Sequence, residues 1–153
     1  MSWLLQVIYY LIPQLQFNYA MQKLIIAGAN GFIGRHLTRH FCREGWEVVG
    51  LARRQKGLDP NCRHVLWDGK SIGDWASELN GATAVVNLAG RSINCRHNKK
   101  NKQEIIDSRV QSTTILGEAI AACSHPPAVW LNASTASIYA DAENKPQGEG
   151  MKM

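Results

Sequence analysis

The sequence predicts an α/β fold in which about five parallel strands form one doubly wound sheet with helices on its faces. Short apolar runs recur along the chain without polar alternation, which is typical of strands buried on both faces. Between them lie longer segments whose apolar residues are three and four positions apart, as on one side of a helix. Strands that alternate with helices form parallel sheets, which bind ligands at the carboxyl ends of their strands.

The first predicted unit is a strand, a tight turn, a helix and a second strand. We expect a strand over residues 23–27 and a helix from residue 32 to about residue 44, which Gly45 then stops. The second strand is expected over residues 47–51. The helix carries apolar side chains at four-residue spacing: Ile33, Leu37 and Phe41.

Three further strands are expected over residues 63–66, 84–88 and 128–132. A modest helix is expected around residues 72–79 and a long helix from about residue 102 to residue 123. The long helix has apolar or small residues at alternating spacings of four and three: Ile106, Val110, Thr113, Gly117 and Ile120. This order of elements completes the predicted sheet.

Length and composition fit one globular domain, which we assign to residues 21–153. The chain has 153 residues, of which 45% are hydrophobic and 19% are charged, as in ordinary globular proteins. The net charge of +5 suits an anionic ligand. The four cysteines are scattered without a CxxC pair, and the histidines show no metal-ligand spacing. We therefore expect reduced thiols, no metal site and a cytoplasmic protein.

Residues 1–20 form an apolar extension ahead of this domain. The apolar run from Trp3 to Ile12 has no Lys or Arg before it and is followed by Pro13. It is too short to span a bilayer, and it lacks the basic segment of a signal peptide. We expect an upstream extension without a membrane role, and the alternative is a peripheral membrane or partner contact.

A glycine-rich turn follows the first strand, with the sequence Gly28-Ala29-Asn30-Gly31-Phe32-Ile33-Gly34. Glycines at GxxGxxG spacing leave room for a ligand against the backbone, and the next helix offers free N–H groups to a pyrophosphate. Because the turn lies between a strand and a helix, it is typical of the Rossmann dinucleotide-binding fold. The alternative is a purely structural turn. The residues expected to bind the cofactor are Gly28, Asn30, Gly31, Phe32, Ile33 and Gly34.

Each of the next three strands is also followed by candidate cofactor-binding residues. Arg53 and Arg54 follow the second strand about twenty residues beyond the turn, where NAD-binding proteins place an acid. The two guanidinium groups favour the 2′-phosphate of NADP(H) over NAD(H), and the alternative is a solvated pair. Asp68 is expected to accept a hydrogen bond from the adenine amino group, unless it is an exposed loop acid. Small residues after the fourth strand would let the backbone lie against the cofactor: Asn87, Leu88, Ala89 and Gly90.

These motifs resemble those of the short-chain dehydrogenase/reductase superfamily, in particular its extended, epimerase-like branch. The segment Ile106-Asp107-Ser108-Arg109-Val110 is similar to a helix of NAD(P)-dependent sugar-nucleotide epimerase-like proteins, and the resemblance covers residues 21 to about 150. It implies an oxidoreductase that acts on a nucleotide-sugar-like or other small carbonyl or alcohol substrate. It also implies a catalytic hydroxyl after the fifth strand, for which Thr135 is the candidate and Ser134 the alternative.

The YxxxK pair that the superfamily carries after its fifth strand is absent there, because Tyr139 is followed four residues later by Glu143. The resemblance implies that the later strands and the substrate-binding region are missing and that catalysis needs residues beyond Met153. The fifth strand would then be a sheet edge, which favours association into a homo-oligomer.

Two other functions are compatible with the sequence. Without YxxxK, the chain is compatible with a sensor or scaffold that binds NADP(H) and does not turn it over. The basic segment from Arg91 to Lys102 suggests, more remotely, nucleic-acid binding, but it has no interleaved aromatic residues. We expect this segment to form a basic loop beside the site. The expected partners are a nucleotide cofactor and a small molecule, with neither nucleic acid nor membrane.

Overall fold

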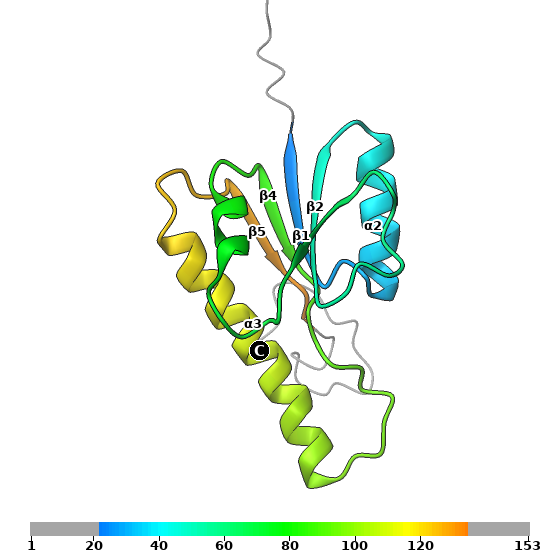
Figure 1. Ribbon diagram of the computed structural model, residues 1–153. Helices are drawn as coiled ribbons and strands as arrows, with labels where there is room; N and C mark the ends of the chain where they lie inside the picture. Colours follow the sequence, from blue (N-terminus) through cyan, green and yellow to red (C-terminus); the bar gives the residue numbers. More distant parts are fainter. Residues whose placement is uncertain (1–21, 135–153) are drawn as a thin grey trace, which may run out of the picture.

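A central sheet of five parallel strands organises the molecule (Figure 1). The computed structural model describes residues 22–134, so Thr135 and the apolar extension at residues 1–20 lie outside the described residues. The strands follow the order β3-β2-β1-β4-β5. Their bounds are β1 Lys23–Ala27, β2 Glu47–Ala52, β3 Arg63–Leu66, β4 Ala84–Asn87 and β5 Val129–Asn132. The predicted fold class, a Rossmann-type parallel sheet, is confirmed.

Helices cover both faces of the sheet. α2 (Phe32–Arg43) lies on one face, while η1 (Asp74–Leu79) and α3 (Lys99–Ala121) lie together on the other (Figure 1). The strand order reverses between β1 and β4, so the connections after these two strands diverge and leave a crevice at their carboxyl ends. Within residues 22–134, no helix has the length and apolar character needed to cross a membrane.

The central strands are buried on both faces, which explains why their sequences lack polar alternation. One core cluster packs Ile25 and Val85 with Leu116 of α3. The second core cluster contains Ile26, and Phe41 of α2 packs against this cluster. Ile25 and Ile26 are both 0% exposed, although they point to opposite faces of β1. Burial on both sides therefore fixes β1 at the centre of the sheet.

α3 differs from the predicted long helix in its start and in its buried face. It begins at Lys99, ahead of the expected residue 102, because the Asn98 side chain accepts a hydrogen bond from the Asn101 amide (2.8 Å) and caps the helix. The first turns of α3 extend past the carboxyl ends of the strands (Figure 1). Ile106 and Val110, in this half, are 54% and 58% exposed. The buried residues of the helix are Ser112, Leu116 and Ala119.

η1 is shorter and tighter than the helix expected around residues 72–79. It is a 3-10 helix of six residues that starts at Asp74. Trp75 and Leu79 are buried, whereas Ile72 lies ahead of the helix and is 54% exposed. Trp75 Nε1 donates to the Ser71 carbonyl (2.9 Å), which holds the ring in place. The element therefore contributes two core side chains and little regular structure.

β5 forms one edge of the described sheet and exposes apolar side chains. Val129, Trp130 and Leu131 are 47%, 39% and 56% exposed. The Trp130 ring also approaches α3, since a Cβ on Gly117 would lie 3.4 Å from it. An apolar sheet edge of this kind favours association, and the homo-oligomer stays a prediction.

An ion cluster ties the amino ends of three strands to η1. Glu78 of η1 accepts two hydrogen bonds from the Arg63 guanidinium (2.5 and 2.7 Å) and lies 3.1 Å from Lys23 Nζ. Arg63 also pairs with Glu47 (3.0 Å). The hydrogen bond from Arg63 is the main reason that the pKa of Glu78 falls to about 2. These charges neutralise one another at the end of the sheet opposite the crevice.

We expect Glu78→Gln to remove a pH-dependent part of the free energy of unfolding. A carboxyl with a lowered folded pKa stabilises the protein above its unfolded pKa of 4.5, and that stabilisation is lost as the pH falls toward about 2. The stability difference between wild type and variant, measured by urea unfolding, should therefore shrink across this window. A difference that stays constant with pH would contradict the assigned role of the cluster.

Candidate functional site

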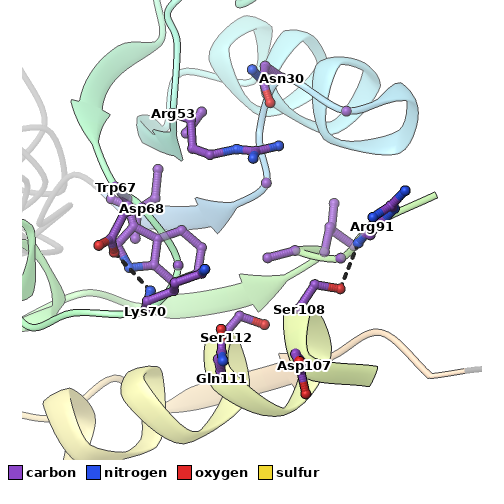
Figure 2. A pocket seen from close by; sticks show the side chains of 18 of the residues that line it. Asn30, Arg53, Trp67, Asp68, Lys70, Arg91, Asp107, Ser108, Gln111 and Ser112 are labelled. Carbon is purple, nitrogen blue, oxygen red and sulfur yellow. Dashed lines mark hydrogen bonds between the residues drawn. The ribbon is translucent and has the colours of Figure 1, made fainter. Parts of the chain in front are cut away.

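A cavity of about 610 Å³ lies at the carboxyl ends of the strands (Figure 2). Asn30 and Arg53 lie on one wall, polar side chains of α3 lie on the wall facing them, and residues 67–70 close a third side (Figure 2). The structure thus brings together segments that follow β1, β2, β3 and β4. The predicted cofactor-binding residues that line the cavity are Gly28, Asn30, Gly31, Arg53, Asp68, Leu88, Ala89 and Gly90.

Gly28 places the turn after β1 directly against the chain after β4. Its φ of +79° is in the left-handed region that favours glycine. A Cβ on Gly28 would lie 3.0 Å from the Leu88 carbonyl carbon and 3.0 Å from the Ala89 nitrogen. The Gly28 amide donates to the Leu51 carbonyl of β2 (2.9 Å). Only a residue without a side chain permits this contact between three strand ends.

α2 begins at the same turn with an uncapped N-terminus. Its N-cap is Gly31, no side chain caps the helix, and its first turn has no acidic residue. Phe32 and Ile33 are 74% and 57% exposed. Neither residue lines the cavity. Their backbone N–H groups, however, belong to the first helical turn, which has no intrahelical acceptors for them.

Gly34 is buried beneath the turn and does not line the cavity. A Cβ there would lie 2.6 Å from the carbonyl oxygens of both Gly28 and Ala29. Backbone atoms cannot move aside as a flexible side chain can. The third glycine of the motif therefore sets how closely α2 approaches the turn.

Gly34→Ala should lower the free energy of unfolding by about 3 kcal/mol, because the new methyl group meets fixed backbone. Gly45→Ala is the matched control. Gly45 has a φ of +82°, but a methyl group added to it would meet no atom within 4 Å, so this change should cost only backbone strain of about 1 kcal/mol. Urea denaturation measures both values, and equal losses would show that the contact at Gly34 is unimportant.

Arg53 and Arg54 follow β2 beside the glycine turn. The Arg53 side chain lies on the cavity wall near Asn30 (Figure 2). Asn30 Nδ2 donates to the Arg54 carbonyl (3.2 Å), which ties the turn to the chain after β2. A second hollow is lined by Asn30, Arg53 and Arg54. One corner of the site thus combines two guanidinium groups with the start of α2.

Asp68 closes a tight turn as well as lining the cavity. Its Oδ1 accepts hydrogen bonds from the amides of Lys70 (2.8 Å) and Ser71 (3.0 Å). These bonds, above all the one from the Ser71 amide, hold the pKa of Asp68 below its ordinary value. One carboxylate oxygen is thereby committed to the backbone. The contact between Asp68 and the adenine amino group stays a prediction, and Oδ2 would be the oxygen that accepts this hydrogen bond.

Asn87 anchors the site from below and does not line the cavity. It is 3% exposed, and its Oδ1 accepts from the Ala89 amide (3.0 Å). Its Nδ2 donates to Asn132 Oδ1 of β5 (2.7 Å) and to Thr113 Oγ1 of α3 (3.3 Å). The Asn87 side chain therefore links β4 to β5 and α3 by hydrogen bonds, next to the chain that lines the cavity.

Sequence reasoning missed the wall of the cavity that α3 forms. Its polar stripe continues the buried stripe of Leu116 and Ala119 further along the helix. Extending the buried stripe toward the start of the helix would have predicted this wall. The lining side chains of α3 are Glu104, Asp107, Ser108, Gln111 and Ser112.

Trp67, which is buried and lines the cavity, was also missed. Its Nε1 has no hydrogen-bond partner among the described residues.

The remaining candidates lie outside this cavity or change their role. Ser134 is exposed and does not line the cavity, and Thr135 lies beyond the described residues.

The prediction that residues 91–102 form a basic loop is wrong in part. Residues 99–102 form the first turn of α3, and the charge of Arg91 is paired with Glu104. No group of three potential metal ligands occurs among the residues that the structure describes.

A glycine turn at the reversal of a parallel sheet, opening onto an uncapped helix, defines a Rossmann dinucleotide-binding domain. The chain matches the NAD dependent epimerase/dehydratase family over residues 24–152 and belongs to that family. Human epimerase family protein SDR39U1 is 32% identical over 120 residues, which are 76% of this chain and 38% of that protein. Epimerase family protein SSP1921 of Staphylococcus saprophyticus is 33% identical over 120 residues, which are 78% of this chain and 39% of that protein.

Solved structures are similar over the same region. Human SDR39U1 (isoform 2) with NADPH has a TM-score of 0.65 and 29% identity, and covers 84% of this chain and 43% of its own. MoeE5 in complex with UDP-glucuronic acid and NAD has a TM-score of 0.65 and 27% identity, and covers 79% of this chain and 39% of its own. The chain thus spans about two fifths of the length of the relatives it matches.

Proposed function

We propose that this chain binds NADP(H) in the cavity at the carboxyl ends of its strands. The observation that carries the proposal is the joint placement of the glycine turn, the uncapped start of α2 and the two arginines after β2 around one cavity. Each of these features suits an anionic group of a dinucleotide. NAD(H) is proposed as a weaker ligand of the same cavity.

The glycine turn fits a pyrophosphate. Gly28 and Gly31 line the cavity and present backbone without side chains. The first-turn N–H groups of α2 have no cap and no nearby first-turn acid to compete with an anion. The positive end of the helix dipole adds to the attraction. These backbone groups are proposed to hold the pyrophosphate oxygens.

The corner formed by Asn30, Arg53 and Arg54 fits the 2′-phosphate of NADP(H). Arg53 is the principal candidate because it lines both the main cavity and the adjoining hollow. Guanidinium groups bind phosphate with charge-assisted hydrogen bonds that a ribose hydroxyl cannot match. The human relative with NADPH supports this choice, whereas MoeE5, which is similar in fold, was solved with NAD.

Arg53→Ala should weaken NADPH binding about 10- to 100-fold and leave NADH binding almost unchanged, because only NADPH carries the 2′-phosphate. Arg39→Ala, on the exposed surface of α2 outside the cavity, is the matched control for loss of one positive charge. Fluorescence titration of the nicotinamide measures both dissociation constants. Equal weakening of the two cofactors would contradict the assigned role of Arg53.

The oxidoreductase chemistry and the nucleotide-sugar-like substrate belong to the same proposal. MoeE5 was solved with UDP-glucuronic acid as well as NAD, which supports this substrate class. A bound nicotinamide would supply a hydride donor or acceptor. Thr135, or Ser134 beside it, is the proposed hydroxyl that polarises or orients the reacting carbonyl or alcohol. A cytoplasmic location is proposed from the scattered cysteines, all four of which are free thiols.

We propose that the chain by itself binds NADP(H) without turnover, since no YxxxK pair follows the fifth strand and Tyr139 is followed four residues later by Glu143. When the chain is mixed with NADP⁺ and UDP-glucuronic acid, absorbance at 340 nm should stay at baseline, and chromatography should show the UDP-glucuronic acid unchanged. This behaviour is also that of an NADP(H)-binding sensor or scaffold. A steady rise in absorbance, or conversion of the UDP-glucuronic acid to an epimer, would show that the chemistry is complete in this chain.

A further inference from the structure

Arg91, in the chain after β4, is held against α3 by several bonds. Its amide donates to the Ser108 hydroxyl (2.8 Å), and its carbonyl accepts a hydrogen bond from Arg109 Nη1 (3.3 Å). Its guanidinium forms an ion pair with Glu104 and donates to Asn101 Oδ1 (3.0 Å). Both the backbone and the side chain of Arg91 are therefore tied to the first half of α3.

Ser108 is oriented to accept from the Arg91 amide. Its hydroxyl donates to the Ile105 carbonyl of the preceding turn (2.9 Å), so its proton is committed and its lone pairs remain for Arg91. Figure 2 marks the bond between Arg91 and Ser108, both of which line the cavity. The hydroxyl thus fixes the backbone of the cavity wall at this point.

Arg109 fixes the same stretch from outside the cavity, which it does not line. Its Nη1 donates to the Ile105 carbonyl (3.2 Å) as well as to the Arg91 carbonyl. Its guanidinium lies against Gly90, where a Cβ would be 3.3 Å from Cζ. A flat guanidinium can bridge two carbonyls while lying on the backbone, and a lysine ammonium cannot reproduce this arrangement.

We propose that Ser108 and Arg109 are positioning residues that hold the backbone of residues 90–92 as a fixed wall of the cavity and thereby set its affinity for the dinucleotide. This inference rests on the proposed function, because it takes the cavity as the NADP(H) site. The preceding backbone anchor is the bond from the Ala89 amide to Asn87 Oδ1 (3.0 Å). Ser108 and Arg109 extend that anchoring along the wall.

Two measurements on the whole 153-residue chain test the inference. The first is the NADPH dissociation constant, and the second is the hydrogen exchange rate of the Arg91 amide, followed by NMR without ligand. Ser108→Ala should weaken NADPH binding about three- to tenfold, since one hydrogen bond is lost, and should speed exchange at Arg91. Ser108→Thr, which keeps the hydroxyl, should restore both values.

Two further variants complete the test. Arg109→Lys should also weaken NADPH binding about threefold or more, although the positive charge is kept. Ser77→Ala removes a comparable hydroxyl bond, from Ser77 Oγ to the Asp74 carbonyl (2.7 Å) in η1, outside the cavity lining. This control should change neither the NADPH affinity nor the exchange rate at Arg91.

Unchanged exchange at Arg91 in Ser108→Ala would overturn the tether, and faster exchange with unchanged NADPH affinity would overturn its role in binding. If the wild-type chain binds no NADPH, the proposed function fails and the cofactor role of the pair fails with it. The ligand-free exchange rates distinguish that failure from a failure of the tether.

Discussion

The close approach of Gly28 to the backbone after β4 is the constraint on which the rest of the site depends. β1 and β4 are neighbours in parallel register, with Ala27 opposite Asn87, so both chains leave the sheet at the same level. A side chain at Gly28 would meet the backbone at 3.0 Å and force the two exits apart. Because they stay together, the β1 turn and the start of α2 share one cavity with the chain after β4.

The two ends of the sheet use charge in opposite ways. At the amino ends, Lys23 and Arg63 meet Glu47 and Glu78 in one cluster, and these charges are satisfied within the protein. At the carboxyl ends, a hollow is lined by Asn30 with Arg53 and Arg54 and contains no acidic residue. The positive end of a helix dipole and two guanidinium groups, neither of which forms an ion pair within residues 22–134, attract an anion. The charges at the amino ends of the strands thus stabilise the fold, whereas those at the carboxyl ends are available to a ligand.

The strands were predictable from sequence, whereas the faces of the helices were predicted only in part. β1 and β3 have the expected bounds. For β1 the reason is that an apolar segment buried on both faces forms a strand more readily than any other element, whereas β3 is a short and partly exposed edge strand. Periodicity failed at Ile106 and Val110, since it does not show that half of α3 extends past the sheet. The polar wall of α3, and the anchoring role of Asn87, likewise depend on which elements meet in space.

Binding of the NADP(H) pyrophosphate at the glycine turn can be followed residue by residue in an NMR titration of the amide resonances with NADPH. We predict that the amides of residues 28–34 shift strongly and saturably, because the uncapped N–H groups at the start of α2 would contact the ligand and the glycine turn would lie against it. Amides beside the ion cluster at Glu47 and Arg63, at the far end of the strands, should stay in place. Resonances of residues 28–34 that do not move at saturating NADPH would show that the glycine turn does not bind the pyrophosphate.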